Sequence, residues 1–282
     1  MAHREMHFAG TWYPRSAEEC ARMMEQFREG LQLPEVPDRL HGGILPHAGW
    51  QFSGKTAFSV LLALQRAVRP RLLFLFGMHL PARSPNYVFI DEGFRTPLGP
   101  VEAHREAARR LAEGFDFVVE HTSSCRPDNT IELQLPFIKA LFPEARVVAA
   151  GIAPGDAAVA LGERAVQVAG ELGEPACFLG STDLTHYGPG YGFTPRGTGP
   201  AAVGWVRGEN DRRIIDRFLS LRPEEVVPEA LHHRNACCPG AAAAALAAGR
   251  RAKADRGHLV HYCTSYDLAP DSSFVGYAGV VF

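Results

Sequence analysis

The chain has 282 residues, of which 46% are hydrophobic and 21% are charged, a composition typical of a folded globular protein and not of a disordered one. Its formal net charge of -2 provides no global field that would attract nucleic acid or an anionic membrane surface, so we expect neither as a partner.

Targeting signals and regular cysteine patterns are not evident. The first residues have no apolar core of a signal peptide, and no stretch approaches 18 consecutive apolar residues. The six cysteines, at positions 20, 125, 177, 237, 238 and 263, do not have the spacing of a disulfide framework or of a paired CxxC zinc site. We therefore expect a cytoplasmic protein in which most cysteines are small buried side chains.

Strands and helices alternate in the first half of the chain. Helical spacing of Glu, Arg and Met predicts a helix over 16–31, and a strand then runs to residue 46 before a helix at 53–66. The next strand is expected at 71–76, followed by a strand at 86–94, a Pro/Gly-rich loop at 95–100 and a helix at 101–114. A polar loop at 120–129 leads into a helix that begins at residue 130.

The second half continues the alternation. Strands at 146–151 and 176–180 enclose a helix at 157–172, and a loop covers 189–200. Helical stretches follow at 203–220, 222–231 and 241–248, and strands at 258–265 and 273–282 end the chain. The pattern predicts one α/β domain over residues 1–282, with a central mixed, largely parallel sheet flanked by helices.

Three histidines follow closely on runs with the character of buried strands: His47, His79 and His186. Because ligands of open α/β sheets bind outside the carboxyl ends of the strands, these three side chains are expected to share one crevice. Each alone is also consistent with a turn residue whose ring is hydrogen-bonded. Together they favour a metal or acid/base site.

The third metal ligand is expected from the cysteine pair Cys237 and Cys238, which directly precedes the alanine-rich helix. A helix N-terminus lowers the pKa of a thiol, and the thiolate is the form that binds metal. Two imidazoles and a thiolate favour copper or zinc without excluding iron. The alternative is that the two cysteines only pack the start of the helix.

Asp183 and His186 are the expected partners in proton chemistry. His186 fits a general acid/base or a residue that supports the metal ligands. Asp183 orients this histidine or, alternatively, caps the turn that follows the strand.

Further side chains could line the same pocket. Asn129 and Glu132 open a helix beside a polar loop, where the alternative for Asn129 is a helix cap. Arg95 could hold an anionic group, or form a surface ion pair. Tyr262 and Ser265 lie at the end of a late strand and Trp50 follows His47 closely, and all three are expected near the pocket.

Seven segments spread through the chain resemble the Memo family, known in prokaryotes as protein B of the AmmeMemoRadiSam system. They are residues 7–14, 45–50, 94–99, 131–136, 181–188, 235–240 and 271–279. The resemblance implies the fold of the LigB-type class III extradiol ring-cleaving dioxygenases. It also implies a metal site in which His47, His79 and Cys238 are the ligands, with Asp183 and His186 beside them.

The sequence departs from the family pattern at two points. Asn129 stands where the family commonly has a pocket histidine, which puts in doubt any acid/base chemistry that used that histidine. The cysteine segment reads Cys-Cys-Pro-Gly in place of the usual Cys-Gly. An ungapped alignment favours Cys238 as the ligand but leaves Cys237 open.

The resulting expectation is a metal-dependent redox enzyme, with iron or copper and possible zinc, that acts on an unidentified small substrate. The alternative is a non-catalytic module whose pocket recognises a peptide or a partner protein. The family's association with a radical S-adenosylmethionine protein and an AMMECR-like protein makes these two the expected partners. Extradiol cleavage of a catechol is disfavoured, because a thiolate replaces the carboxylate ligand.

Overall fold

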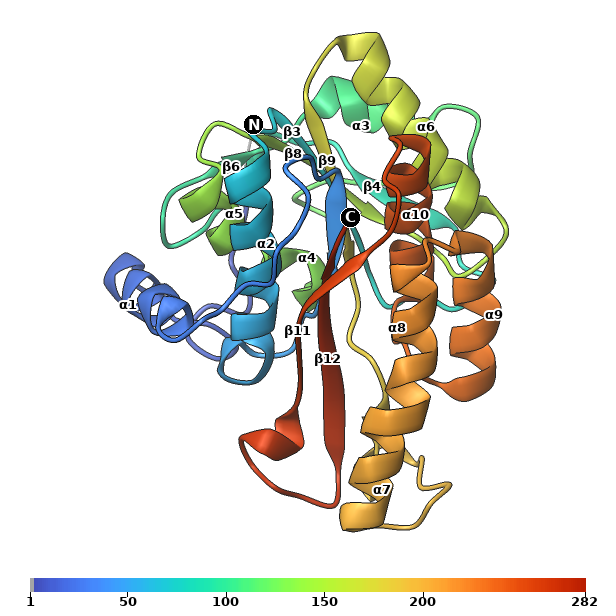
Figure 1. Ribbon diagram of the computed structural model, residues 1–282. Helices are drawn as coiled ribbons and strands as arrows, with labels where there is room; N and C mark the ends of the chain where they lie inside the picture. Colours follow the sequence, from blue (N-terminus) through green and yellow to red (C-terminus); the bar gives the residue numbers. More distant parts are fainter. Residues whose placement is uncertain (1–2) are drawn as a thin grey trace.

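A large mixed sheet forms the centre of the computed structural model, which describes residues 3–282 (Figure 1). Within these residues it has nine strands, in the order β10-β12-β2-β9-β3-β8-β4-β7, with β11 paired to β12. The strands are β2 (Gly42–Leu45), β3 (Leu72–Gly77), β4 (Asn86–Phe89), β7 (Phe117–Glu120), β8 (Arg146–Gly151), β9 (Ala176–Ser181), β10 (His186–Tyr187), β11 (His258–Thr264) and β12 (Phe274–Val281).

The middle of the sheet is parallel and the margin at β12 is antiparallel, whereas at the other margin β4 runs antiparallel to β8 and parallel to β7. Strand β9 pairs in parallel with both β2 and β3, and β3 pairs in parallel with β8. Strand β12 runs antiparallel to β2, β10 and β11. The expected α/β fold with a mixed, largely parallel sheet is confirmed, and the three strands β2, β9 and β3 direct their carboxyl ends to one edge.

Helices cover both faces of the sheet (Figure 1). One face packs against α1 (Ala17–Arg28), α2 (Lys55–Ala67) and α5 (Leu135–Leu141), and the other against α3 (Arg105–Ala112), α6 (Ala157–Leu172), α8 (Asp211–Leu219), α9 (Pro223–His233) and α10 (Pro239–Arg251). Short helices α4 (Asn129–Glu132) and α7 (Pro200–Trp205) complete the set. None of the helices within residues 3–282 combines the length and apolar character needed to cross a lipid bilayer.

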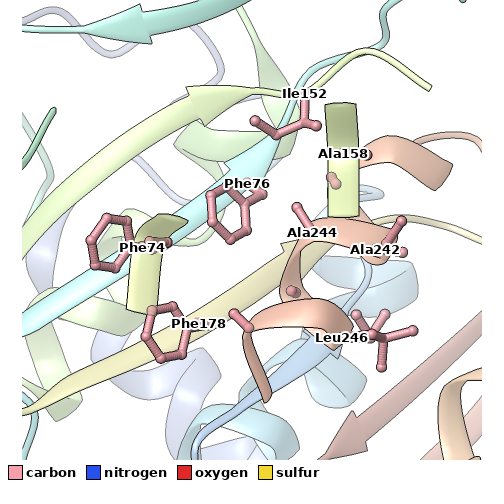
Figure 2. Packing of buried hydrophobic residues seen from close by; sticks show 14 of the residues in the cluster. Phe74, Phe76, Ile152, Ala158, Phe178, Ala242, Ala244 and Leu246 are labelled. Atoms are coloured by element: carbon pink, nitrogen blue, oxygen red, sulfur yellow. The ribbon is translucent and has the colours of Figure 1, made fainter. Parts of the chain in front are cut away.

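Strand β3 shows why two hydrophobic layers form. Phe74 and Phe76 belong to the cluster under α6 and α10, whereas Leu73 and Leu75 belong to the cluster under α2 and α5. Successive side chains of a strand point to opposite faces, so an uninterrupted apolar run is buried on both. Figure 2 shows Phe74, Phe76 and Phe178 packed near the alanines of α10.

Helix α10 packs very closely because it is built from small residues. Ala241 to Ala248 are all fully buried or nearly so, and the helix contacts both α6 and β9. On α6, a Cβ added to Gly162 would lie 2.0 Å from the carbonyl oxygen of Ala244. This close approach fixes the position of α10, and with it the cysteine pair at its start.

Several elements differ from the sequence expectation. The strand expected at 86–94 is divided between β4 and β5 (Gly93–Phe94), and β5 joins β1 (His3–Arg4) and β6 (Val101–Glu102) in a separate small sheet. Part of the helix expected at 101–114 is therefore strand β6, and α3 begins only at Arg105. The polar loop expected from residue 120 is preceded by β7, a four-residue strand at the edge of the sheet in which Val118 and Val119 are exposed.

Two expected helices contain irregular turns. A π-helical turn, Trp50–Gly54, precedes α2, and another, Val206–Asn210, joins α7 to α8. The first of these begins three residues after His47 and forms part of the cavity described below. Extra residues in a helical turn are frequent near functional sites because they redirect side chains.

Candidate metal centre

His47 and His79 lie beyond the ends of β2 and β3, two strands that flank β9. Their Nε2 atoms are 3.2 Å apart, although 32 residues separate them in the sequence. His47 is buried, with 1% of its surface exposed, whereas His79 is exposed. The edge of the parallel strands therefore brings the two imidazoles together with one ring inside the protein and one facing outward.

A strained backbone turn places His79. Met78, between β3 and the histidine, has a φ of 67°, a left-handed conformation that is uncommon for a residue with a side chain. Its N–H donates to the hydroxyl of Thr130 at 2.7 Å. The preceding Gly77 is required there, because an added Cβ would lie 2.2 Å from Thr130 Oγ1. Tight contact with α4 thus sets where His79 leaves the strand.

The cysteine pair at the start of α10 completes the group. Cys237 Sγ lies 3.3 Å from His47 Nε2 and 3.8 Å from Cys238 Sγ, and one ligand atom from each of these two cysteines and two histidines falls within 4.8 Å of the others. The backbone N–H of Cys237 donates to the carbonyl of Asp183 at 3.1 Å. Both thiols are therefore within the same small volume as the two imidazoles.

Hydrogen bonds define which nitrogen of His47 faces the group. The Ser181 hydroxyl donates to the carbonyl of Thr130 at 2.8 Å, so its oxygen is left to accept from His47 Nδ1, at 2.9 Å. A proton on Nδ1 leaves Nε2 as the nitrogen that can bind a metal. A hydrogen bond of this kind to the distal nitrogen is the usual support of a histidine ligand.

Electrostatics favour a charged pair between His47 and Cys237. Burial lowers the pKa of the His47 imidazole, but the Asp183 carboxylate and the Cys237 sulfur outweigh it and raise the pKa to about 9. Burial likewise opposes ionisation of Cys237, but hydrogen bonding from Cys238 and the charge on His47 hold its pKa well below the usual range. The backbone N–H of Asp183 also donates to this sulfur, at 3.3 Å.

Cys238 differs from its neighbour in burial and charge. Its surface is 2% exposed, and burial together with the adjacent Cys237 sulfur keeps its pKa well above the usual range. Cys237 is therefore the more acidic thiol of the pair.

The donor spacing fits a single transition-metal ion. With metal–nitrogen bonds of about 2.0 Å and metal–sulfur bonds of about 2.3 Å, tetrahedral ligands are about 3.3 Å apart for two nitrogens and about 3.5 Å for nitrogen and sulfur. The corresponding distances here are 3.2 Å between the His47 and His79 Nε2 atoms and 3.3 Å between His47 Nε2 and Cys237 Sγ. Two imidazoles and a thiolate suit copper, zinc or iron.

A cavity of about 530 Å³ opens above this group. His47, His79 and Asn129 line it together with residues of the first π-helical turn, the segment 183–191 and the hairpin between β11 and β12. Its volume is in the range of small-molecule sites. A ligand in this cavity would reach the two histidines directly.

Asp183 and His186 both line the cavity. Asp183 accepts the backbone N–H of His47 at 2.7 Å, and its other carboxylate oxygen lies 4.0 Å from His47 Nε2. Burial raises the pKa of Asp183. Asp183 therefore contacts His47 and does not orient His186. Nδ1 of His186 donates to the Leu184 carbonyl at 3.1 Å, which leaves Nε2 as its basic nitrogen.

Of the other pocket candidates, Ser265 and Asn129 line the cavity. Asn129 donates its amide N–H to the His47 carbonyl at 3.0 Å. It is the first residue of α4, and the cap is Asp128. The structure does not bring Trp50, Arg95, Glu132 or Tyr262 to the cavity.

These four side chains have contacts elsewhere. Trp50 stacks on Phe137 in the core, and Arg95 pairs with Glu5 at 3.0 Å. Glu132 accepts from the backbone N–H groups of residues 7 and 8 and from Tyr13, and Tyr262 donates to Asp211 at 2.8 Å.

The sequence interpretation assigned no role to Ser181, Trp12 or Tyr191. Ser181 ends a strand at the same edge as the histidines. This strand-end position is the sequence feature that could have identified it as a residue of the site. Trp12 and Tyr191 lie in Gly- and Pro-containing segments, and both line the cavity. The positions of Trp12 and Tyr191 depend on contacts between segments that are distant in the sequence. The periodicity of hydrophobic residues contains no information on such contacts.

Comparisons with known proteins agree over the length of the chain. The family described as "Memo-like protein" matches residues 4–281. The chain is 33% identical to a MEMO1 family protein of Methanopyrus kandleri, over 97% of this chain and 96% of that protein. It is 30% identical to one of Thermococcus onnurineus, over 97% of both.

Among solved structures, the chain is similar to the crystal structure of an uncharacterized protein from Escherichia coli K12. The TM-score is 0.58 at 12% sequence identity, covering 86% of this chain and 100% of the other. A similarity at this identity shows a shared fold alone. The match along the whole chain, together with these relatives, establishes that the chain belongs to the Memo-like protein family.

Proposed function

We propose that the protein is a metal-dependent redox enzyme that holds one iron or copper ion on His47, His79 and a cysteine thiolate. The observation that carries the proposal is the convergence of four donor side chains, from two strand ends and a helix start, within 4.8 Å. Such a grouping places soft and borderline ligands around one point, at the floor of a cavity large enough for a small substrate.

Cys237 is the proposed thiolate ligand. Its sulfur lies 3.3 Å from His47 Nε2 and accepts the backbone N–H of Asp183. Cys238, at 3.8 Å between the two sulfurs, would then donate its S–H to the metal-bound thiolate. This assignment differs from the ungapped family alignment, which favours Cys238 as the ligand.

Three protein ligands leave a coordination position for substrate or a small molecule, as in catalytic metal sites. Bound there, iron or copper would supply one-electron chemistry to a molecule in the cavity. The protein's part is to bind the substrate against the exposed His79, to hold the ring of His47 through Ser181, and to move protons. His186 is the proposed base, since its Nε2 is the basic nitrogen on the wall of the cavity.

The metal is tested on anaerobically purified protein by elemental analysis after reconstitution with ferrous iron, cuprous copper and zinc. We expect close to one equivalent in the wild type and in Cys238→Ser, and a large loss in His47→Ala and Cys237→Ser. The two serine variants are matched controls, because they make the same change at neighbouring positions. Loss in Cys238→Ser with retention in Cys237→Ser would reverse the ligand assignment.

The redox role is tested by mixing the metal-loaded protein with oxygen and small aromatic or polar substrates. The rate of oxygen consumption measures turnover. His186→Gln is expected to reduce turnover about 10²- to 10⁴-fold, the usual contribution of a general base, while metal content stays near one equivalent. If no metal binds to the wild type under any condition, the cavity is better explained as a binding pocket for a peptide or partner protein.

A further inference from the structure

The geometry points to a substrate class for this cavity: a small aromatic molecule that carries a positively charged amine, with its ring between aromatic walls and its amine at the mouth. This inference rests on the proposed function, because it takes the metal group as the floor of the cavity. The inference goes beyond the proposed function by assigning the cavity a preference for the charge of its substrate. The identity of the metal ligands does not determine this preference.

Exposure separates the floor of the cavity from its mouth. His47, Asp183 and Tyr277 are at most 4% exposed, whereas Trp12 and Tyr191 are 41% and 42% exposed. All five line the same cavity. Trp12 and Tyr191, which come from opposite halves of the chain, therefore lie at the mouth of the cavity.

Beyond its histidines and a metal bound to them, the cavity offers little to attract an anionic substrate. Among the described residues 3–282, the side chains that line it include no lysine or arginine. The nearby Arg234 donates to the carbonyls of Tyr191 and Gly192 and lies 4.7 Å from the Phe193 ring centroid. Arg95, an early candidate for an anion partner, pairs with Glu5 elsewhere.

An ionised carboxylate is present at the mouth instead. Asp271 is exposed and lines the cavity. The Ser272 hydroxyl and, more weakly, the Ser273 N–H donate to its Oδ1 at 3.0 Å and 3.4 Å, and the Ser272 hydrogen bond lowers the pKa of this carboxyl. Both of these hydrogen bonds are on Oδ1, and the exposed carboxylate is accessible to a ligand in the cavity.

The aromatic walls suit the same ligand. Trp12, Phe52, Tyr191 and Tyr277 all line the cavity. Aromatic rings bind other rings through offset or edge contacts, and Trp and Tyr faces attract cations. A ring with an amine uses both properties, whereas a neutral ring uses only the first and a carboxylate is repelled by Asp271.

The test is a titration with three probes that share one phenol ring and differ in charge: tyramine (cation), 4-ethylphenol (neutral) and 3-(4-hydroxyphenyl)propionate (anion). Each is titrated by calorimetry into protein loaded with zinc, which has no redox chemistry, after elemental analysis confirms the loading. We expect tyramine to bind about three- to fivefold more tightly than 4-ethylphenol, the range of an exposed charge pair, and the propionate to bind most weakly.

Two variants assign the selectivity. Asp271→Asn keeps the acceptor oxygen for Ser272 and should bring tyramine and 4-ethylphenol to similar affinity. Trp12→Ala should weaken both. The matched control is Asp255→Asn, which removes the same charge from an exposed carboxylate that does not line the cavity and should leave the preference unchanged.

The outcomes separate this inference from the metal proposal. Zinc loading with equal binding of the three probes, with preference for the propionate, or with no binding would overturn the inference and leave the metal centre standing. Failure to load zinc, iron or copper contradicts the metal proposal. The same titration of the metal-free protein then decides the charge preference alone.

Discussion

Ser181 connects the ring of His47 to helix α4 by accepting from Nδ1 and donating to the Thr130 carbonyl. Ser181→Ala removes this support, and we expect metal affinity to fall by about 10- to 100-fold, the usual cost of losing a partner of a histidine ligand. Competition with a chromophoric chelator measures the affinity.

Ser59→Ala is the matched control, because Ser59 is also a fully buried serine but donates to the Lys55 carbonyl within α2. Its metal affinity should equal that of the wild type. An unchanged affinity in Ser181→Ala would mean that the hydrogen bond to Nδ1 does not support metal binding.

Asp211 is a fully buried carboxyl that accepts from Thr185 and Tyr262. Burial outweighs these hydrogen bonds and raises its pKa from 3.8 to about 6. Because the folded state binds this proton more tightly than the unfolded state, the group adds stability at low pH, and this stability is lost as pH rises through about 6.

Asp211→Asn removes this titration and keeps the shape of the side chain. We expect the free energy of unfolding of the wild type, relative to this variant, to be about 1.4 kcal/mol larger at pH 5 than at pH 7. Urea unfolding of both proteins at the two pH values measures the difference. A constant difference would show that Asp211 has an ordinary pKa.

At the scale of elements, the contact between α6 and α10 determines where the cysteine pair lies. Gly162→Ala would place a Cβ 2.0 Å from the Ala244 carbonyl oxygen, and forcing the helices apart should cost about 2 kcal/mol or more of unfolding free energy. Gly170 lies on the same helix with nothing within 4 Å of an added Cβ, so Gly170→Ala should stabilise by about 0.5–1 kcal/mol.

Chemical denaturation of the two variants measures the change in unfolding free energy, which we expect to be a loss for Gly162→Ala and a gain for Gly170→Ala. Equal effects would indicate that α6 and α10 are not in close contact. Because α10 carries Cys237 and Cys238 at its start, Gly162→Ala should also weaken metal binding, while Gly170→Ala should not.

The sequence predicted the elements that are buried on both sides and missed those that depend on pairing. Leu72 to Gly77 and the alanines of α10 carry strong local patterns. Strand β7 has four residues at the edge of the sheet, and β5 has only two residues, so neither is long enough to show the period of a strand. Their strand conformation comes from hydrogen bonds to β4 in the first case and to β1 and β6 in the second.

For the site as well, the sequence did not indicate features that depend on contacts with distant parts of the chain. Histidines at strand ends indicated the crevice because topology alone brings β2, β9 and β3 side by side. Arg95 and Glu132 were candidates by residue type, but packing with Glu5 and with the segment 7–13 places them outside the cavity. The tertiary structure determines which groups Arg95 and Glu132 contact, and the local sequence around each residue does not predict those contacts.

For the molecule as a whole, a metal on this group would connect segments that are up to 190 residues apart in the sequence. A ligand that binds only the folded state stabilises it by about 2.7 kcal/mol at a concentration of 100 times Kd. We expect metal loading to raise the thermal unfolding midpoint, and a chelator to reverse the rise.

His79→Ala is the appropriate control, since this side chain is exposed and its loss should leave the metal-free stability unchanged. The variant should show no rise in the midpoint with metal. A rise equal to that of the wild type would mean that the ion binds elsewhere.

Thr130 holds the segments of both histidines: its carbonyl accepts from Ser181, the partner of His47, and its hydroxyl accepts the N–H of Met78, which precedes His79. The separation of the two rings therefore depends on one residue that is not itself a ligand. A substitution of Thr130 is therefore expected to change the distance between the two rings while both histidines stay the same.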